Sequence, residues 1–135
     1  MRADGFSRQP LVRMTNVNLE PGDAGTLEEL IAATGDGILI ETNRSWSIDS
    51  LRLGFQFGGQ AAWKIEDGRR GRLLRNPSYS GVTPEFWASC DAICSASEWE
   101  LASFIDCGKG EPGQFAHVSH GCAPARFRDV EMGTA

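Results

Sequence analysis

A cysteine in a glycine-rich segment is the feature of this sequence best suited to chemistry. Cys107 opens the run Cys-Gly-Lys-Gly-Glu-Pro-Gly-Gln over residues 107–114. Glycines let the backbone bend tightly beside the sulfur, and a thiolate held in this way is a good ligand for zinc. An ordinary, partly buried thiol fits the same residues, so the segment alone leaves both interpretations open.

The sequence lacks the partners that would complete a catalytic metal site around Cys107. Neither a His-Glu-x-x-x-His nor a His-Glu-x-x-His motif occurs in the 135 residues. A catalytic zinc needs three protein ligands and one open position. Cys107 would therefore be one ligand of a site whose other ligands come from elsewhere.

A second, independent metal or redox site is a competing hypothesis. His117-x-x-His120-x-Cys122 could combine with Cys107, or with Cys90 and Cys94, and all of these are zinc-ligand types. The spacing is not that of a zinc finger or ribbon. In a regular strand His117 and His120 would also point to opposite faces.

The elements expected to position these residues are mostly strands, and sixteen glycines favour such a turn-rich architecture. Thr26 and Glu29 form a capping box, which predicts a short helix that ends at Gly35. A buried strand over 38–40 should follow. Residues 1–25 should be extended and irregular, with 13–16 a strand or an edge segment whose neighbours lie upstream.

The strongest periodicity predicts a three-stranded antiparallel meander over residues 47–75. Two alternating apolar runs are separated by Gly58–Gly59, which predicts a hairpin turn there, and Asp67–Gly68 predicts a second turn. The third strand is basic, as expected for a solvated edge, although contact with an acidic partner chain or with a substrate carboxylate is an alternative. The apolar positions are Leu51, Leu53, Phe55, Phe57, Ala61, Trp63 and Ile65, and the basic ones are Arg69, Arg70, Arg72 and Arg75.

A second helix should begin at Thr83-Pro84-Glu85 and place Phe86, Cys90, Ile93 and Cys94 on one apolar face. Cys90 and Cys94 would then be small buried hydrophobic residues. Strands over 99–105 and 113–119 should flank a Cys107 loop, and a last strand should cover 126–130. The predicted fold class is α+β, mostly antiparallel β-sheet with two short helices.

Composition excludes several functional classes. A net charge of −5 argues against general nucleic-acid binding, and no apolar run is long enough to cross a bilayer. Four unevenly spaced cysteines without an export signal are typical of reduced thiols. We therefore expect a cytoplasmic protein that binds neither nucleic acid nor membrane.

Four further segments accompany the Cys107 loop and together suggest a family. They are Arg13-Met14-Thr15-Asn16, Gly54-Phe55-Gln56-Phe57-Gly58, Asn76-Pro77-x-Tyr79-x-Gly81-Val82-Thr83 and Gly133-Thr134-Ala135. From about Pro10 to its last residue, the sequence resembles the C-terminal portion of the TldD/PmbA family of metallopeptidases, on the TldD side.

The resemblance implies that residues 1–135 are the C-terminal domain, or a fragment of it, of a larger two-domain zinc metallopeptidase that hydrolyses unfolded peptides. Cys107 would be the third protein ligand of zinc. The two histidines and the glutamate general base of the family's His-Glu-x-x-x-His helix have no counterpart here and are expected upstream. This chain therefore contains no catalytic residue, and on its own it should be inactive.

The resemblance also implies a substrate mode and partners. An extended peptide would be held against a sheet, with Gly54, Gln56, Gly58, Gly108 and Lys109 as candidate substrate-binding residues; the glycines could instead only form turns. The chain is expected to form a homo- or hetero-oligomer with a TldD- or PmbA-like chain. The alternative function is a non-catalytic partner or scaffold subunit that binds such a chain.

Overall fold

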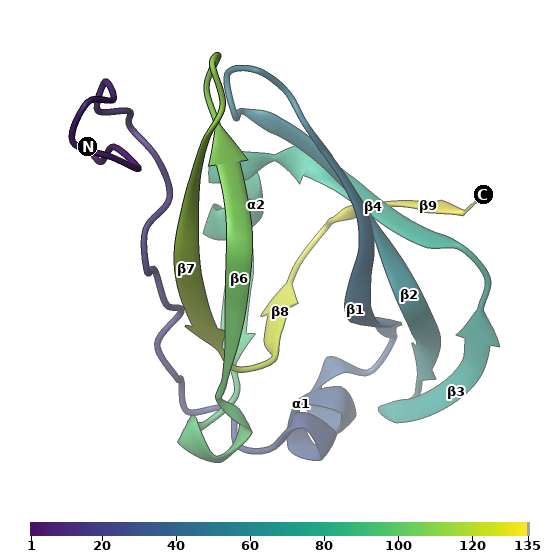
Figure 1. The fold of residues 1–135 in the computed structure, drawn as a ribbon. Coiled ribbons are helices and arrows are strands. Elements are labelled where there is room, and N and C mark those ends of the chain that lie inside the picture. Colours follow the sequence, from purple (N-terminus) through teal and green to yellow (C-terminus); the bar gives the residue numbers. More distant parts are fainter. Residues whose placement is uncertain (135) are drawn as a thin grey trace.

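The computed structural model describes residues 1–134, which fold into two helices and nine strands with antiparallel pairing throughout (Figure 1). Ala135, the last residue of the closing motif, lies outside the described residues. The predicted α+β class is confirmed. The helices are α1 (Leu27–Thr34) and α2 (Thr83–Ala88), with a short 3-10 turn at Ala96–Glu98. The strands are β1 (Gly37–Ile48), β2 (Gly54–Glu66), β3 (Arg69–Leu74), β4 (Pro77–Val82), β5 (Cys90–Ile93), β6 (Glu100–Lys109), β7 (Gln114–Cys122), β8 (Ala125–Phe127) and β9 (Glu131–Thr134).

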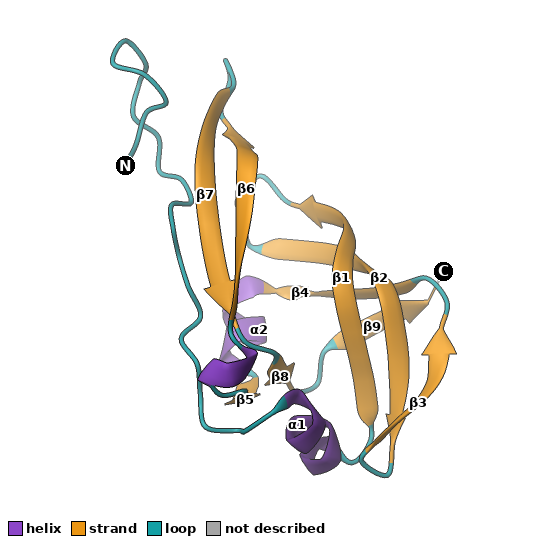
Figure 2. Ribbon diagram, turned by 60° about the horizontal axis from the view of Figure 1, so that its bottom comes forward, coloured by secondary structure: helices purple, strands orange, loops and turns teal. Residues whose placement is uncertain are grey.

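The main sheet is built around β2, which has neighbours on both sides along its length. Strand order is β1-β2-β4-β9, with β3 beside the second half of β2. The first half of β2 pairs with β4, from Gly54 opposite Val82 to Gly58 opposite Ser78. The second half pairs with β3 as far as Glu66 opposite Arg69, through the predicted turn at Asp67–Gly68. The small β5–β8 and β6–β7 pairs lie beside this sheet (Figure 2).

The predicted meander exists, but its boundaries and its first turn were wrong. Strands β1, β2 and β3 form it over residues 37–74, and β2 runs straight through Gly58–Gly59. A Cβ at Gly59 would lie 2.5 Å from Ile40 Cγ2, and one at Gly58 would lie 2.6 Å from Ser45 Oγ. The two glycines therefore make room for side chains of β1 and do not turn the chain.

The real turn between β1 and β2 is held by a side chain. The Asp49 carboxylate accepts hydrogen bonds from the amides of Leu53 (3.1 Å) and Gly54 (2.5 Å). These bonds to the charged form lower the pKa of Asp49. The turn thus depends on an Asp side chain. A single Asp in a sequence predicts a turn less clearly than a pair of glycines does.

Helix α1 forms as predicted. Thr26 caps it, with the complete capping box to Glu29, and Gly35 follows with φ 73°. Leu30 on its inner face packs in a small core with Cys94 and Ala123, partly covered by Trp99. The helix is therefore joined to the region between β5 and β8.

The second helix is shorter than predicted. Helix α2 ends at Ala88, and Cys90–Ile93 forms strand β5, which pairs with β8 from Cys90 opposite Phe127 to Ile93 opposite Ala125. Phe86 stacks on Phe127 at 4.0 Å between ring centroids. Strand pairing therefore overrides the helical spacing, since a short apolar run is compatible with either state.

The last strand and the two cysteines of the predicted helix are also placed differently. Strands β8 and β9 replace the single strand predicted over 126–130. Cys94 is fully buried, as predicted for a small hydrophobic residue, whereas Cys90 is only half-buried. Neither lies on a helix.

A charge cluster ties α1 to the β5–β8 pair. The Asp91 carboxylate accepts from Arg126 Nε (2.7 Å) and Nη2 (3.1 Å) and from Arg128 Nε (2.5 Å). Arg126 also donates to the Ala33 carbonyl at the end of α1 (3.1 Å). The two guanidinium groups lower the pKa of Asp91 to about 2.

This cluster predicts a specific acid sensitivity. Because the folded pKa is below the ordinary 3.8, the carboxylate's contribution is complete above about pH 4 and is lost as pH falls towards 2. Asp91→Asn should lower the melting temperature at neutral pH and flatten its fall between pH 4 and 2, measured by circular dichroism. Asp23→Asn is the matched control and should behave as wild type. Equal acid profiles for Asp91→Asn and wild type would contradict this assignment.

Candidate metal-ligand site on the β6–β7 hairpin

Strands β6 and β7 form a two-stranded sheet of their own that stands beside the main sheet (Figure 1). They extend the predicted strands 99–105 and 113–119, so the connecting loop is shorter than expected. Cys107 lies within β6, opposite Ala116, and not in the loop where it was predicted. Main-chain pairing thus fixes the backbone of Cys107.

A bulge immediately precedes Cys107. Phe104 pairs with Val118 and Cys107 pairs with Ala116, so β6 uses one residue more than β7 over this step. A bulge bends a strand and changes the direction of the side chains next to it. The half-buried Cys107 therefore lies directly after a bend in β6.

The N-terminal residues 1–19 run along β7 as an arm (Figure 1). From this arm the Arg13 guanidinium donates to the carbonyls of Cys107 and Gln114. The Lys109 ammonium donates to the Val12 carbonyl. The backbone on both sides of Gly108 is thus held by contacts with the arm.

The arm also covers the outer edge of β7 with side-chain acceptors. Amides of Phe115, Ser119 and Gly121 donate to Asp4, Asn16 and Asn18, at 3.1, 3.0 and 2.9 Å. The prediction of a strand over 13–16 was therefore wrong, whereas its alternative, an edge segment, describes these residues. The segment is not a strand, because side chains supply hydrogen bonds that a paired backbone would make, and its partners lie downstream.

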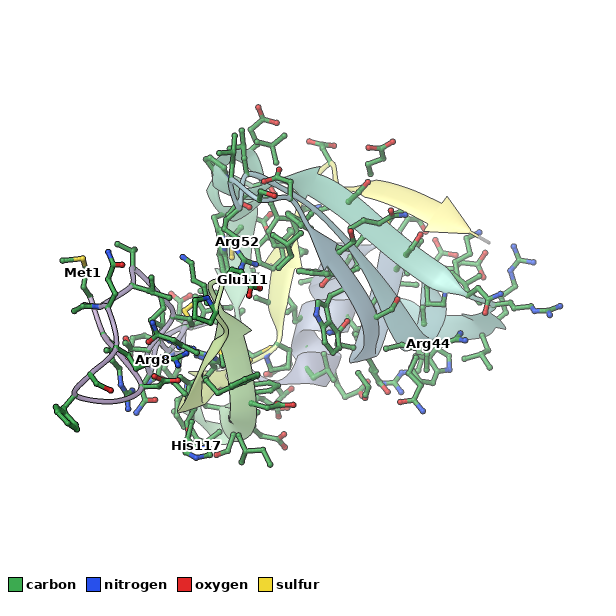
Figure 3. The ribbon with its side chains drawn as sticks, turned by 45° about the horizontal axis from the view of Figure 1, so that its top comes forward. Met1, Arg8, Arg44, Arg52, Glu111 and His117 are labelled. Atoms are coloured by element: carbon green, nitrogen blue, oxygen red, sulfur yellow. The ribbon has the colours of Figure 1, made fainter. Side chains whose placement is uncertain are left out.

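The other candidate ligands do not gather around Cys107. Figure 3 shows His117 on the outer side of the hairpin, away from the main sheet, and its side chain is exposed. His120 lies beside the arm, with Nδ1 3.0 Å from the Val17 carbonyl oxygen. Cys122 is exposed and Cys94 is buried in the core.

The residues present do not fit a complete zinc site. Across residues 1–134, no three His, Cys, Asp or Glu side chains come close enough together to hold a metal ion. The separate metal or redox cluster kept open by the sequence therefore has no geometric support in this part of the chain. Cys107 remains a single candidate ligand.

The candidate substrate-binding residues fall on two different sheets. Gly54, Gln56 and Gly58 lie in β2 between β1 and β4, so main-chain groups there already have neighbours on both sides. The Gln56 side chain is exposed. Gly108 and Lys109 lie in β6 next to Cys107. The structure thus does not bring the two groups together.

Sequence reasoning did not assign a role to Arg13. The residue stood within one of the family-like segments, but nothing local connects it with Cys107, which lies 94 positions further along the chain. Its Nε atom is buried and has no hydrogen-bond partner within the described residues. Its contact with the Cys107 carbonyl makes it a support of the candidate site, beside the strand pairing with Ala116.

The fold and this hairpin define a mostly antiparallel α+β domain with a single candidate metal ligand. Residues 1–134 match the sequence model of the PmbA/TldA metallopeptidase C-terminal domain, and the chain therefore belongs to this family. The recognition made from the Cys107 loop and its companion segments is confirmed.

Curated relatives carry matching names. A metalloprotease of Methanocaldococcus jannaschii is 34% identical over 120 residues, which are 89% of this chain and 25% of the relative. A metalloprotease of Methanothermobacter thermautotrophicus is 31% identical over 125 residues, 93% of this chain and 26% of the relative. A zinc metalloprotease TldD homolog of Saccharolobus solfataricus is 27% identical over 132 residues, 98% of this chain and 28% of the relative. This chain thus spans about a quarter of the length of these relatives.

Within residues 1–134, no helix combines the length and the hydrophobicity needed to cross a lipid bilayer.

Proposed function

We propose that this chain acts as the C-terminal domain of a zinc metallopeptidase that hydrolyses unfolded peptides, and that Cys107 supplies one ligand to the zinc. Family membership and the names of the relatives support the class of enzyme. The observation that carries the role of Cys107 is the bracing of its backbone by Ala116 and Arg13. Cys107 is a half-buried thiol on a braced strand, with no second or third ligand near it in the described residues.

The surroundings of Cys107 suit a residue that must be held in place for a shared site. Strand pairing with Ala116 fixes the backbone of Cys107, and Arg13 of the N-terminal arm donates a hydrogen bond to the Cys107 carbonyl. A metal ligand must keep its position within a fraction of an ångström, and such supporting contacts provide that. Arg13 is therefore a positioning residue for Cys107.

The remaining ligands and the general base belong, in this proposal, to a His-Glu-x-x-x-His helix upstream of these residues in a larger two-domain fold. A catalytic zinc has three protein ligands and one open position. Cys107 supplies one of the three, so two more must come from residues outside this chain. We also place the enzyme in the cytoplasm. The four free cysteines agree with a reducing compartment.

The peptide would be bound near Cys107 by Gly108 and Lys109. Gly108 has no side chain to obstruct a close approach, and Lys109 is a cation two residues from the thiol. Gln56 could contribute through its exposed side chain. Gly54 and Gly58 could contact a peptide only from the face of the sheet, since both edges of β2 are occupied.

The alternative is a non-catalytic partner or scaffold subunit that binds a TldD- or PmbA-like chain. The exposed apolar side chains of β6 favour this alternative, since such side chains mark protein contacts. Co-purification of this chain with a separate metallopeptidase chain that is fully active without Cys107 would support it.

The first test uses the chain alone. Because it offers one ligand, the purified 135 residues should retain well below one zinc per chain after dialysis and should not hydrolyse an unfolded peptide. Metal content by mass spectrometry and a casein-type cleavage assay measure both. One tightly bound zinc per chain, together with chelator-sensitive cleavage, would show that the chain holds a complete site.

A further inference from the structure

Gln114, the first residue of β7, has a buried polar side chain that is only 4% exposed. Both ends of its side-chain amide are bonded to the N-terminal arm. Its Oε1 accepts from the Asp4 amide (3.1 Å), and its Nε2 donates to the Gln9 carbonyl (2.8 Å). A buried amide is costly unless its donor and its acceptor are both satisfied, so these two bonds fix the arm against the start of β7.

The arm residues in these bonds belong to a loop that is closed on itself. The main chains of Arg2 and Leu11 exchange hydrogen bonds of 2.9 and 3.0 Å, which closes residues 2–11 into a loop, here called the clasp. The clasp also contacts the tip of the hairpin, where Arg8 Nη2 donates to the Gly113 carbonyl (2.5 Å). Clasp and hairpin therefore form one unit.

The clasp leads directly into the contacts that hold Cys107. Arg13, two residues after the clasp, donates to the carbonyls of Cys107 and Gln114. The Lys109 ammonium donates to the Val12 carbonyl, and Lys109 lies opposite Gln114 in the β6–β7 ladder. The position of Arg13 on the hairpin therefore depends on how firmly the clasp is attached, and Gln114 attaches it.

Cys107 and Gln114 lie on the same face of the hairpin. Residues directly opposite each other in an antiparallel pair share a face, and the face alternates along each strand. The ladder pairs Cys107 with Ala116 and, two residues along, pairs Lys109 with Gln114. Burial alternates in the same way, since Gln114 and Ala116 are buried and Phe115 between them is 60% exposed. The clasp is thus attached to the face from which the Cys107 side chain projects.

We infer that Gln114 is a positioning residue for Cys107. Its buried amide fixes the clasp on the hairpin, and the attached clasp sets Arg13 on the Cys107 carbonyl. For zinc binding this role rests on the proposed function, since a ligand that is held less firmly binds the metal more weakly. The coupling between Gln114 and Cys107 is a property of residues 1–134 themselves and needs neither zinc nor substrate.

Gln114→Glu in the 135-residue chain tests the attachment of the clasp. At neutral pH a carboxylate cannot donate to the Gln9 carbonyl, so the clasp should detach while the rest of the fold persists. The Phe115 amide, which donates to the clasp, should then lose its protection against hydrogen exchange. The Gly121 amide, which donates to the arm beyond the clasp, should keep its protection.

Alkylation by iodoacetamide, followed at each cysteine by mass spectrometry, measures the effect on Cys107. Gln114→Glu should make Cys107 react about tenfold faster, as expected when local opening becomes easier by the net contribution of one or two hydrogen bonds. Cys122, an exposed thiol on β7, should keep its rate. Arg13→Lys should also speed the reaction of Cys107. The double variant Gln114→Glu/Arg13→Lys should be no faster than Gln114→Glu, because both changes release the same contact.

Gln9→Glu is the matched control, because it makes the same chemical change at an exposed residue of the clasp, and it should behave as wild type in both measurements. Gln114→Met, which fills a similar volume without hydrogen bonds, carries the test if the buried carboxylate of Gln114→Glu prevents folding. A folded variant that keeps the protection of Phe115 would overturn the inference. So would an unchanged Cys107 rate after that protection is lost, or additive rates in the double variant.

Zinc affinity in a protein that contains this domain together with the upstream ligands separates this role from the proposed function. Gln114→Glu should weaken zinc binding about 10–100-fold, as do other residues that support a zinc ligand. Unchanged affinity in Gln114→Glu, with loss of zinc in Cys107→Ser, would overturn the positioning role and leave the proposed function intact. Unchanged affinity in both variants would overturn the proposed function, whereas the exchange and alkylation rates would still decide the coupling of Gln114 to Cys107.

Discussion

Gly121→Ala should destabilise this domain by about 1–3 kcal/mol, as expected for overpacking in a closely packed region. A Cβ at Gly121 would lie 1.8 Å from Trp99 Cζ2 and 2.2 Å from Cη2. The indole cannot easily withdraw, because its Nε1 donates to the Leu19 carbonyl (3.0 Å) and its ring packs on the core beside Cys94. The backbone of Gly121 is itself held, since its amide donates to Asn18 and its carbonyl accepts from Leu19.

Urea unfolding followed by circular dichroism measures this effect. Gly113→Ala in the same hairpin is the control: the nearest atom to its added Cβ is Phe115 Cε2 at 3.8 Å, so this variant should not be destabilised. At an unobstructed site alanine would stabilise by about 0.4–1 kcal/mol through the unfolded state. A stabilised Gly121→Ala would mean that Trp99 does not cover Gly121.

Local chemistry explains which elements could be predicted from the sequence. The Thr26–Glu29 capping box and Gly35 define α1 through contacts within a few residues, and both were predicted correctly. Asp67–Gly68 gives the turn between β2 and β3 for the same reason. These signals do not depend on where the rest of the chain lies.

The misplaced turn at Gly58–Gly59 shows where local signals mislead. Phe55 and Phe57 before the glycines and Ala61, Trp63 and Ile65 after them all occupy odd positions. The period of two therefore keeps its phase across Gly58–Gly59, which favours one continuous strand. A pair of glycines was taken as a turn, although it makes room for Ile40 and Ser45 of a neighbouring strand. Recognising this requires knowing that β1 lies alongside, which the glycines themselves do not reveal.

The candidate site was predicted in part. Cys107 was found from its own segment, but its place inside β6 depends on pairing with Ala116. The role of Arg13 depends on the N-terminal arm, which runs along β7. The alternation of apolar and polar residues predicts strands and helices but cannot predict such a contact. Cys90 was assigned to a helix because its spacing from Phe86 is helical, whereas pairing with Phe127 makes it a strand residue.

Cys107→Ser should have the largest functional effect in a protein that contains this domain together with the upstream ligands. A suitable protein is a chimaera in which these residues replace the matching segment of the zinc metalloprotease TldD homolog of Saccharolobus solfataricus. Even residues that only support zinc ligands cost about 10–100-fold in metal affinity or activity when replaced. Loss of a ligand should therefore reduce peptide cleavage at least about a hundredfold.

Two controls separate this effect from a general disturbance of the hairpin. Cys122→Ser changes an exposed thiol on β7 and should leave cleavage unchanged. Arg13→Lys should give an intermediate loss, because a lysine cannot reproduce the guanidinium contact with two carbonyls. Equal losses for Cys107→Ser and Cys122→Ser would point to folding instead of metal binding.

The zinc content of the folded chimaera tests the central claim most directly. Metal analysis should find about one zinc per chain in the parent and in Cys122→Ser, and well below one in Cys107→Ser with an unchanged circular dichroism spectrum. A folded Cys107→Ser chimaera that keeps its zinc would contradict the assignment of Cys107 as a ligand.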